Sequence, residues 1–310
     1  MAILVTGGAG FIGSHIVDEL VARKTRGRQV HVLDDLSAGK EENVPDAASL
    51  HLHDVRDQEA ASLIAEQEFE ILIHHAAQTD VRKSVERPGF DADVNITGLL
   101  NLMEAGRRNG LRKVIFASTG GAVYGEPEYF PQDEEHPVRP ESPYGVSKAS
   151  AEKYLELYRR SYGIDVVSLR YSNVYGPRQN AGGGGGGVIA IFISQMINGE
   201  LPEVYGSGEQ TRDYVYVDDV VRANMSSVEY DGSVTVNIGT GQEITVNEVF
   251  RTVREKTGAK VKKTHGSARP GEQQRSVLSY EKAHEKLGWR PEMSFEEGVS
   301  KTVEWFRRRA

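Results

Sequence analysis

Tyr144 and Lys148 are the residues of this sequence whose types and spacing best fit acid–base chemistry. They begin and end the segment Tyr144-Gly145-Val146-Ser147-Lys148 at the start of a predicted helix, so their side chains share one helix face. A free tyrosine titrates near pH 10, and its action as a base near pH 7 requires a pKa lowered by about 3. Lys148 would supply one nearby positive charge, and an oxidised nicotinamide ring would supply a second. The pair therefore indicates a phenol that takes a proton in a dehydrogenase-type reaction.

Three glycines near the start of the chain predict a site for a pyrophosphate. The apolar strand Ile3–Thr6 runs into Gly7, Gly10 and Gly13, and the amphipathic segment Ser14–Lys24 follows. Between a strand and a helix, such glycines let backbone N–H groups and the positive end of the helix dipole meet an anion. Gly7 is expected to form the tight turn, Gly10 to admit the phosphates, and Gly13 to bring the helix close to the sheet.

Two acidic residues, about 20 positions further on, point to the sugar next to that pyrophosphate. The predicted strand Gln29–Leu33 ends in Asp34-Asp35, where a carboxylate can accept both hydroxyls of an adenosine ribose. The same charge would repel a 2′-phosphate. The sequence therefore favours NAD over NADP as the cofactor.

Short apolar strands alternate with longer helical patterns through the first half of the chain. Continuous apolar strands are typical of a parallel sheet that is covered on both faces. We therefore predict an α/β fold with a doubly wound, Rossmann-type parallel sheet and ligands at the carboxyl ends of its strands. The expected strands are 3–6, 29–34, 49–54, 71–75, 113–118 and 166–170, and the expected helices include 57–67, 92–109 and 144–162.

Shorter elements and glycine-rich stretches after Arg170 indicate a second, smaller lobe. We predict residues 1–170 as an NAD-binding Rossmann domain and 171–310 as mainly an α/β substrate-binding lobe, with a strand at 234–238 that returns to the main sheet. A chain of 310 residues lies near the upper limit for one domain. Six consecutive glycines, Gly182–Gly187, are expected to be a flexible connector or a lid over a substrate's nucleotide.

The composition excludes several classes of function. Lys and Arg number 37 against 45 Asp and Glu, and the net charge of −8 argues against nucleic acid as the main partner. The absence of cysteine removes disulfides, thiolate metal sites and a cysteine nucleophile. No apolar run approaches the roughly 20 residues of a membrane helix, and the first strand leaves no room for a signal peptide, so a cytoplasmic location is expected. His74-His75 ends a strand with its side chains on opposite faces, so no metal is predicted.

Ordered motifs run along nearly the whole chain. They are Thr6–Gly13, Asp54-Val55, His75–Gln78, Ser118–Gly125, Tyr144 with Lys148, Leu169–Arg178, Arg212–Asp219 and Leu287–Trp289. In this combination the sequence resembles the extended short-chain dehydrogenase/reductases and, within that family, the UDP-glucose 4-epimerases.

The resemblance implies a set of residues that would surround NAD. Asp54 and Val55 would flank the adenine, Asn95 would hold the cofactor from the central helix, and Tyr171 would pack near the nicotinamide. The full expected set is Gly7, Gly10, Phe11, Ile12, Gly13, Asp34, Asp35, Asp54, Val55, Ala76, Ala77, Gln78, Asn95, Tyr144, Lys148 and Tyr171.

The family's UDP-sugar substrate is expected to bind residues of the second lobe. Asn173, Arg212 and Arg269 would bind the diphosphate, for which the fork of an arginine is suited, and Glu272 would reach the uridine ribose. Ser276 matches the family's gate beside the sugar 2-substituent. Because serine is small, N-acetyl hexosamines are expected as substrates alongside UDP-glucose and UDP-galactose.

The mechanism that the resemblance implies runs through a 4-keto sugar. Tyr144 would take the proton of the sugar 4-hydroxyl while the C4 hydride passes to NAD. The 4-keto sugar would then turn over in the site, and the hydride would return to its other face. NAD would be regenerated in each cycle and held tightly, with the protein supplying position and charge.

One position departs from the family pattern. Many relatives carry a Ser or Thr four residues before the Val-Tyr-Gly tyrosine, and here that position is Gly120. We expect Thr119 to supply this hydroxyl through a local shift that the glycine pair permits, with Ser118 as the alternative. Gly120 and Gly121 also stand where dehydratase relatives carry acidic residues, so elimination is disfavoured and epimerisation remains.

Two other functions fit the same motifs, and the resemblance also implies a homodimer. The chain could be another enzyme on the same frame, such as a UDP-glucuronate epimerase or decarboxylase, or a non-catalytic NAD-binding scaffold, although intact Tyr144 and Lys148 argue against a scaffold. By the resemblance, helices 92–109 and 144–162 would pair across a homodimer, or they would face only their own sheet. The residues concerned are Leu99, Leu100, Met103, Tyr154 and Leu157.

Overall fold

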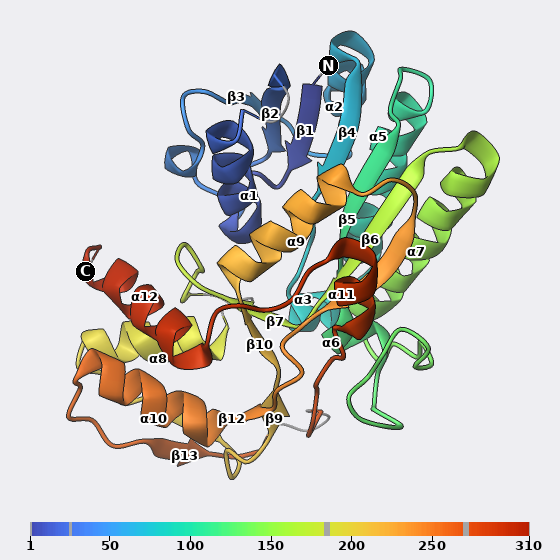
Figure 1. Cartoon of the computed structure of the whole chain (residues 1–310). Coiled ribbons are helices and arrows are strands. Elements are labelled where there is room, and N and C mark those ends of the chain that lie inside the picture. The colour runs from blue at the N-terminus through green and yellow to red at the C-terminus, as the bar shows by residue number, and fades with distance from the viewer. Residues whose placement is uncertain (1, 25–26, 183–186, 269–272, 310) are drawn as a thin grey trace.

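The computed structural model describes residues 2–24, 27–182, 187–268 and 273–309. A parallel sheet with the strand order β11-β6-β5-β4-β1-β2-β3 forms its centre (Figure 1). Every neighbouring pair in this sheet is parallel, which confirms the predicted α/β class. The strands are β1 (Ala2–Thr6), β2 (Gln29–Asp34), β3 (Ser49–Leu52), β4 (Phe69–His74), β5 (Lys113–Thr119), β6 (Asp165–Tyr171) and β11 (Val234–Ile238).

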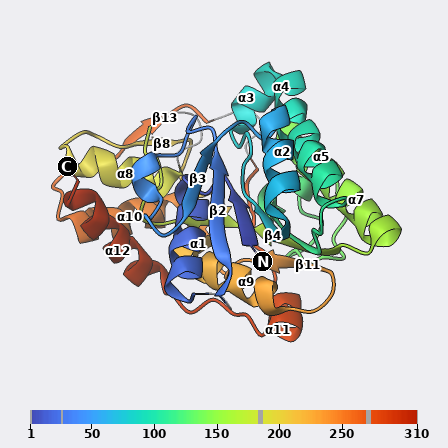
Figure 2. The same cartoon turned by 90° about the horizontal axis from the view of Figure 1, so that it is seen from above.

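Helices cover both faces of this sheet and bury two apolar cores (Figure 2). One core includes Phe116 and the other includes Val167, and both side chains are fully buried. Because both faces are covered, the inner strands are largely apolar, as β1 shows with five buried residues. The helices on the Phe116 face are α2 (Gln58–Gln67), α5 (Gly98–Gly106) and α7 (Pro143–Tyr162); those on the Val167 face are α1 (Phe11–Ala22), α9 (Val217–Glu229) and α11 (Glu281–Leu287).

The order of the strands reverses at β1. This strand pairs with β2 on one side and with β4 on the other, so the loops after β1 and β4 leave the sheet next to each other. Ligands of open α/β sheets bind in a crevice at such a point. The predicted returning strand is β11, which pairs with β6 from Val234 to Ile238.

Much of the second half of the chain forms a smaller lobe that faces the carboxyl ends of the strands (Figure 1). Its helices pack together around a third apolar core, and they are α8 (Val188–Ile197), α10 (Val246–Thr257) and α12 (Phe295–Arg307). Short two-stranded sheets pair β7 (Asn173–Tyr175) with β10 (Tyr214–Tyr216), β9 (Thr211–Arg212) with β12 (Ile244–Thr245), and β8 (Glu203–Tyr205) with β13 (Thr264–Gly266). Because α9, α11 and β11 pack on or within the main sheet, the division at residue 170 stays a prediction. The centre of the glycine tract, 183–186, lies outside the described residues.

The helix predicted at 92–109 begins earlier than expected and is interrupted. It consists of α4 (Pro88–Ala92), a π-helical turn (Asp93–Thr97) and α5. Pro88 can begin the helix because the first turn requires no N–H donor from it. The π-helical turn contains the buried Asn95, and such turns are frequent at functional sites.

The strand predicted at 49–54 ends earlier than expected, at Leu52. Asp54 Oδ1 accepts the backbone N–H of Arg56 at 2.9 Å. Asp side chains compete with neighbouring strands for backbone N–H groups. The bond from Arg56 to Asp54 therefore replaces a hydrogen bond between strands, and the chain turns away from the sheet.

Candidate active site

The loop between β1 and α1 makes a tight turn against the loop after β4. Gly7 has φ +67°, and a Cβ on it would lie 2.7 Å from the backbone nitrogen of Ala76. A Cβ on Gly13 would lie 2.1 Å from the carbonyl oxygen of Gly7. Glycine is therefore required at both positions for the chain to close, and their part in cofactor binding stays a prediction.

The first turn of α1 is free to meet an anion. Gly10 is the N-cap of this helix, and no side chain caps it. The first turn, which includes Phe11 and Ile12, carries no acidic residue. Because N–H groups of a first turn lack partners within the helix, this end of α1 fits the pyrophosphate group of NAD.

Asp34 ties the end of β2 to the same loop. Its Oδ2 accepts the N–H of Ala9, and its Oδ1 accepts the N–H of Leu36, each at 2.9 Å. Burial raises the pKa of this carboxyl group. Asp35 is exposed and accepts bonds from Ser37. Each Asp34 oxygen has a further lone pair, so the predicted bond to the adenosine ribose is compatible with this geometry.

Asp54 and Val55, the residues predicted beside the adenine, lie just after β3. The Arg56 guanidinium donates to both oxygens of Asp54, at 2.9 and 2.6 Å, and lowers the pKa of that carboxyl group. Arg56 also donates to Asp93 at 2.8 Å. A Cβ on Gly98 would lie 2.6 Å from Val55, so the two segments are in close contact.

Polar side chains fix the loop Ala76–Gln78. The N–H of Ala76 donates to Thr6 Oγ1 at 3.2 Å. The Asn95 amide accepts the N–H of Gln78 at 2.9 Å and donates to its carbonyl at 3.0 Å. Asn95, predicted to hold the cofactor directly, therefore holds the loop that borders the cofactor crevice.

Lys148 is a buried cation beside the carboxyl end of β5. Its side chain lies one turn after Tyr144 in α7, and the residue is 3% exposed. Its Nζ donates to the carbonyl of Ala117 at 2.9 Å. Burial lowers the pKa of Lys148 to about 8, and Asp91 and Glu152 oppose this shift.

The chain's own residues do not lower the pKa of the Tyr144 phenol, and its lowering by Lys148 and an oxidised nicotinamide together stays a prediction. Burial raises its pKa, and the carboxylate of Asp91 raises it further. The chain's own residues therefore favour the protonated phenol. A phenolate at neutral pH requires the second positive charge, which an oxidised nicotinamide would supply.

Thr119 and Ser118 have different surroundings. Ser118 is 3% exposed, and its hydroxyl donates to Glu152 at 2.5 Å. Glu152 is in turn ion-paired with the buried Arg170 at 2.6 Å. Thr119 is the N-cap of α6 (Gly120–Val123), but its side chain makes no capping bond. The Thr119 hydroxyl is thus the better candidate for contact with a substrate.

Leu278 explains why position 120 carries no hydroxyl. A Cβ on Gly120 would lie 2.5 Å from Leu278 Cδ1, and Leu278 is fully buried. A serine at this position would have to displace that side chain. Leu278 therefore occupies the space that a side chain at position 120 would need.

Tyr171 and the two adjacent histidines join the ends of β4 and β6. The Tyr171 hydroxyl lies 3.1 Å from His75 Nε2 and accepts a bond from Asn224 at 2.8 Å. His74 Nδ1 lies 2.8 Å from Thr6 Oγ1. Since His74 contacts the Phe116 ring and His75 contacts the Tyr171 ring, the histidines point to opposite faces, as predicted.

Two kinds of feature are absent from the described part of the chain. It holds no group of three or more His, Cys, Asp or Glu side chains arranged to bind a metal. None of its helices combines the length and the apolar character needed to cross a bilayer.

The predicted substrate residues are only partly brought together. Asn173 begins β7, and its N–H donates to the carbonyl of Asp213, the residue after Arg212, at 2.9 Å. Ser276 is only 3% exposed, so protein covers most of it. The other two predicted residues, Arg269 and Glu272, lie outside the described residues.

Two buried acids near the site were missed by the sequence analysis. Asp91 precedes Asn95 by one helical turn and bonds to it at 3.1 Å. Glu152 follows Lys148 by one turn on the same face of α7. Each acid lies four positions from a predicted site residue, Asn95 or Lys148, so the helical spacing could have pointed to it. The spacing does not reveal whether a side chain is buried.

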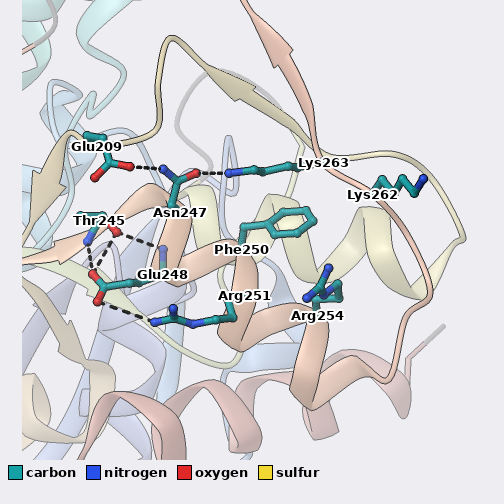
Figure 3. A pocket seen from close by; sticks show the side chains of 9 residues that line it. All are labelled: Glu209, Thr245, Asn247, Glu248, Phe250, Arg251, Arg254, Lys262 and Lys263. Carbon is teal, nitrogen blue, oxygen red and sulfur yellow. Dashed lines mark hydrogen bonds and ion pairs between the residues drawn. The ribbon is translucent and has the colours of Figure 1, made fainter.

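A separate groove lies on the second lobe, over α10 (Figure 3). It has a volume of about 610 Å³ and contains none of the predicted site residues. Its lining is Glu209, Thr245, Asn247, Glu248, Phe250, Arg251, Arg254, Lys262 and Lys263. The candidate active site is instead at the carboxyl ends of the main strands.

Known proteins resemble this chain over its whole length. The family model described as GDP-mannose 4,6 dehydratase matches residues 4–302. A UDP-glucose 4-epimerase of Mycolicibacterium smegmatis is 42% identical over 316 residues, which cover 100% of both chains. The crystal structure of a UDP-glucose 4-epimerase from Thermotoga maritima with UDP-glucose has a TM-score of 0.96 and 47% identity, and it covers 100% of this chain and 99% of that one. The Thermus thermophilus UDP-glucose 4-epimerase in complex with NAD has a TM-score of 0.92 and 46% identity, with 99% of each chain covered.

The chain therefore belongs to the extended short-chain dehydrogenase/reductases, the family of NAD-dependent epimerases and dehydratases. The predicted family resemblance is confirmed. The similarity to UDP-glucose 4-epimerases extends through both lobes, including the small lobe where substrate residues were predicted.

The buried ion pair behind the site leads to a stability prediction. The side chains of Arg170 and Glu152 are 8% and 9% exposed. Glu152→Gln should lower the free energy of unfolding by about 3 kcal/mol, because it leaves a buried guanidinium without its counter-charge. Urea unfolding followed by circular dichroism measures this change.

Glu156→Gln on the same helix is the matched control. The ion pair of Glu156 with Arg159 is 38% and 41% exposed, so water screens it and the unfolding midpoint should stay near that of the wild type. Equal midpoints for the two variants would contradict the structural role of the buried pair.

Proposed function

We propose that this protein is an NAD-dependent UDP-glucose 4-epimerase, which interconverts UDP-glucose and UDP-galactose through a 4-keto sugar. Full-length relatives with this activity, at 42–47% identity, support the assignment. The single observation that carries the proposal is the Tyr144–Lys148 pair on α7, beside the carboxyl end of β5.

The chain's own residues have distinct parts in this reaction. When bound, NAD would accept the hydride from C4 of the sugar and return it to the opposite face. Tyr144 takes the proton of the 4-hydroxyl and gives it back, and the Lys148 charge stabilises the phenolate. Asn173 and Arg212 hold the diphosphate while the keto sugar turns.

Thr119 is proposed as the hydroxyl that contacts the reacting oxygen. The bond of Ser118 to Glu152 and the absence of a capping bond at Thr119 support this choice. Gly120 and Gly121 add no acid beside it, so a route that eliminates a group from the keto sugar has no catalyst at these positions.

Tyr144→Phe tests the mechanism. The variant should lose at least about 10²-fold in kcat, because the proton acceptor is gone. It should keep the wild-type content of NAD, because the glycine loop is intact. A coupled assay of UDP-galactose turnover measures the first quantity, and nucleotide released from denatured protein measures the second.

Tyr154→Phe is the matched control for this variant. Tyr154 lies on the same helix and is 41% exposed, so its variant should turn over substrate like the wild type. Full activity of Tyr144→Phe would exclude the mechanism.

We also propose that the site accepts N-acetylated sugars. The small side chain of Ser276 supports this breadth. UDP-N-acetylglucosamine should be converted to its galacto epimer in the same preparation that converts UDP-galactose, and chromatography of the released sugars distinguishes the products. Conversion of the plain sugars alone would refute the proposal.

A homodimer is proposed from the outer face of α7. Val146, Tyr154 and Leu157 are 49%, 41% and 53% exposed, which is unusual for large apolar side chains on one helix. Leu99 and Met103, also considered for this interface, are fully buried against their own sheet. The proposed interface is therefore formed by α7 more than by α5.

Leu157→Glu should convert the dimer to monomers, because it places a charge in an apolar interface. Light scattering during size-exclusion chromatography measures the mass. Arg254→Glu, an exposed charge change on α10 of the second lobe, should leave the dimer intact. A monomeric wild type would contradict the proposal.

A further inference from the structure

Asp91 joins the elements that carry the cofactor loop and the catalytic pair. It lies in α4 and is fully buried. Its Oδ1 accepts bonds from Gln78 Nε2 at 2.9 Å and from Asn95 Nδ2 at 3.1 Å. Its Oδ2 accepts the hydroxyl of Ser147, the residue before Lys148, at 2.6 Å. One carboxylate thus contacts the loop after β4, the π-helical turn and α7.

The three groups that donate hydrogen bonds to Asp91 are neutral, although the burial of a carboxylate away from water costs free energy. Among the ion pairs of the described residues, none involves Asp91, so these hydrogen bonds are the direct compensation for its burial. A buried charge persists where other charges or hydrogen bonds offset its desolvation. Its charge acts on Lys148 and Tyr144, and it raises the pKa of both.

We propose that Asp91 is a positioning residue of the reaction, which holds the Ala76–Gln78 loop and the Tyr144–Lys148 turn in one arrangement and supplies the negative charge that faces them from α4. This inference rests on the proposed epimerase function. It differs from a purely structural role, because a neutral amide could still hydrogen-bond the same three partners, with Ser147 as acceptor, but could not supply the charge.

The other titratable groups around the pair do not replace Asp91. Glu152, on α7, also faces Lys148, but it is ion-paired with Arg170. Burial lowers the pKa values of His74 and His75, at the end of β4, to about 3, with the Lys148 charge contributing, so both rings are neutral near pH 7. Asp91 is therefore the negative charge that can balance Lys148 and a bound nicotinamide cation.

The direction in which Asp91 shifts the pKa values of Tyr144 and Lys148 follows from its negative charge. A negative charge disfavours the phenolate and favours the ammonium, so it raises the pKa of Tyr144 and of Lys148. Removal of this charge lowers both pKa values. The acidic limb of kcat against pH, which reports the phenol, and the alkaline limb, which reports the ammonium, should both move to lower pH.

Asp91→Asn is the test, because the amide has nearly the same shape and can keep bonds to its neighbours. In protein loaded with NAD, both limbs should move down by at least about 0.5 pH unit. The ultraviolet absorption of tyrosinate, taken as the difference from Tyr144→Phe, should also appear at lower pH. This second readout requires no turnover.

Ser147→Ala is the matched control. It removes one hydrogen bond to Asp91 and keeps the charge, so kcat can fall while the pH limbs and the tyrosinate titration remain at the wild-type positions. If Asp91→Asn lowers activity with an unchanged pH profile and titration, Asp91 has only a structural role and the proposal is overturned.

Different results would contradict the epimerase function and the proposed role of Asp91. A wild type without epimerase activity would end the proposed function. The tyrosinate titration of the NAD-loaded wild type and Asp91→Asn would still decide whether the Asp91 charge acts on Tyr144.

Discussion

The burial of the Lys148 ammonium is the constraint on which the rest of the site depends. Its Nζ bonds to a backbone carbonyl at the end of β5, and the residue is 3% exposed. A buried cation acts strongly on its neighbours, because little water screens it. The same burial makes the charge costly, and the surrounding structure therefore has to supply compensation.

Two acidic residues, on different elements, offset the buried charge of Lys148. Asp91 approaches from α4, and Glu152 lies one turn further along α7. Glu152 also forms an ion pair with Arg170 and accepts a hydrogen bond from the Ser118 hydroxyl. These contacts connect it to β6 and β5 of the main sheet. Burial and the Asp91 charge both raise the pKa of the Tyr144 phenol, so in the proposed mechanism its ionisation depends on the positive charge of a bound oxidised nicotinamide.

The second lobe shapes the same site through a buried acid of its own. Asp213 accepts the N–H groups of Thr240, Gly241 and Leu278 at 2.9 to 3.2 Å. These bonds hold Leu278 against Gly120. Contacts between segments that are far apart in the sequence thus shape the surroundings of Thr119 and Ser118, as the bond of Ser118 to Glu152 also shows.

Periodicity and glycine spacing were enough to predict the parallel sheet, the returning strand and the turn between β1 and α1. These features depend on local rules: an apolar strand between helices is buried on both faces, and residues four apart on a helix share a face. The interruption of the helix at Asp93–Thr97 was not predictable, because no residue type by itself specifies a π-helical turn.

The sequence by itself therefore determined the fold class and the family, and it singled out the Tyr144–Lys148 pair on which the proposed mechanism rests. Only the tertiary structure decided which charges surround that pair and which way they shift it. Asp91 and Ser147 are 56 positions apart, and Gly120 and Leu278 belong to different elements of the fold. Desolvation and contact between such distant residues are set by packing, which no local spacing encodes.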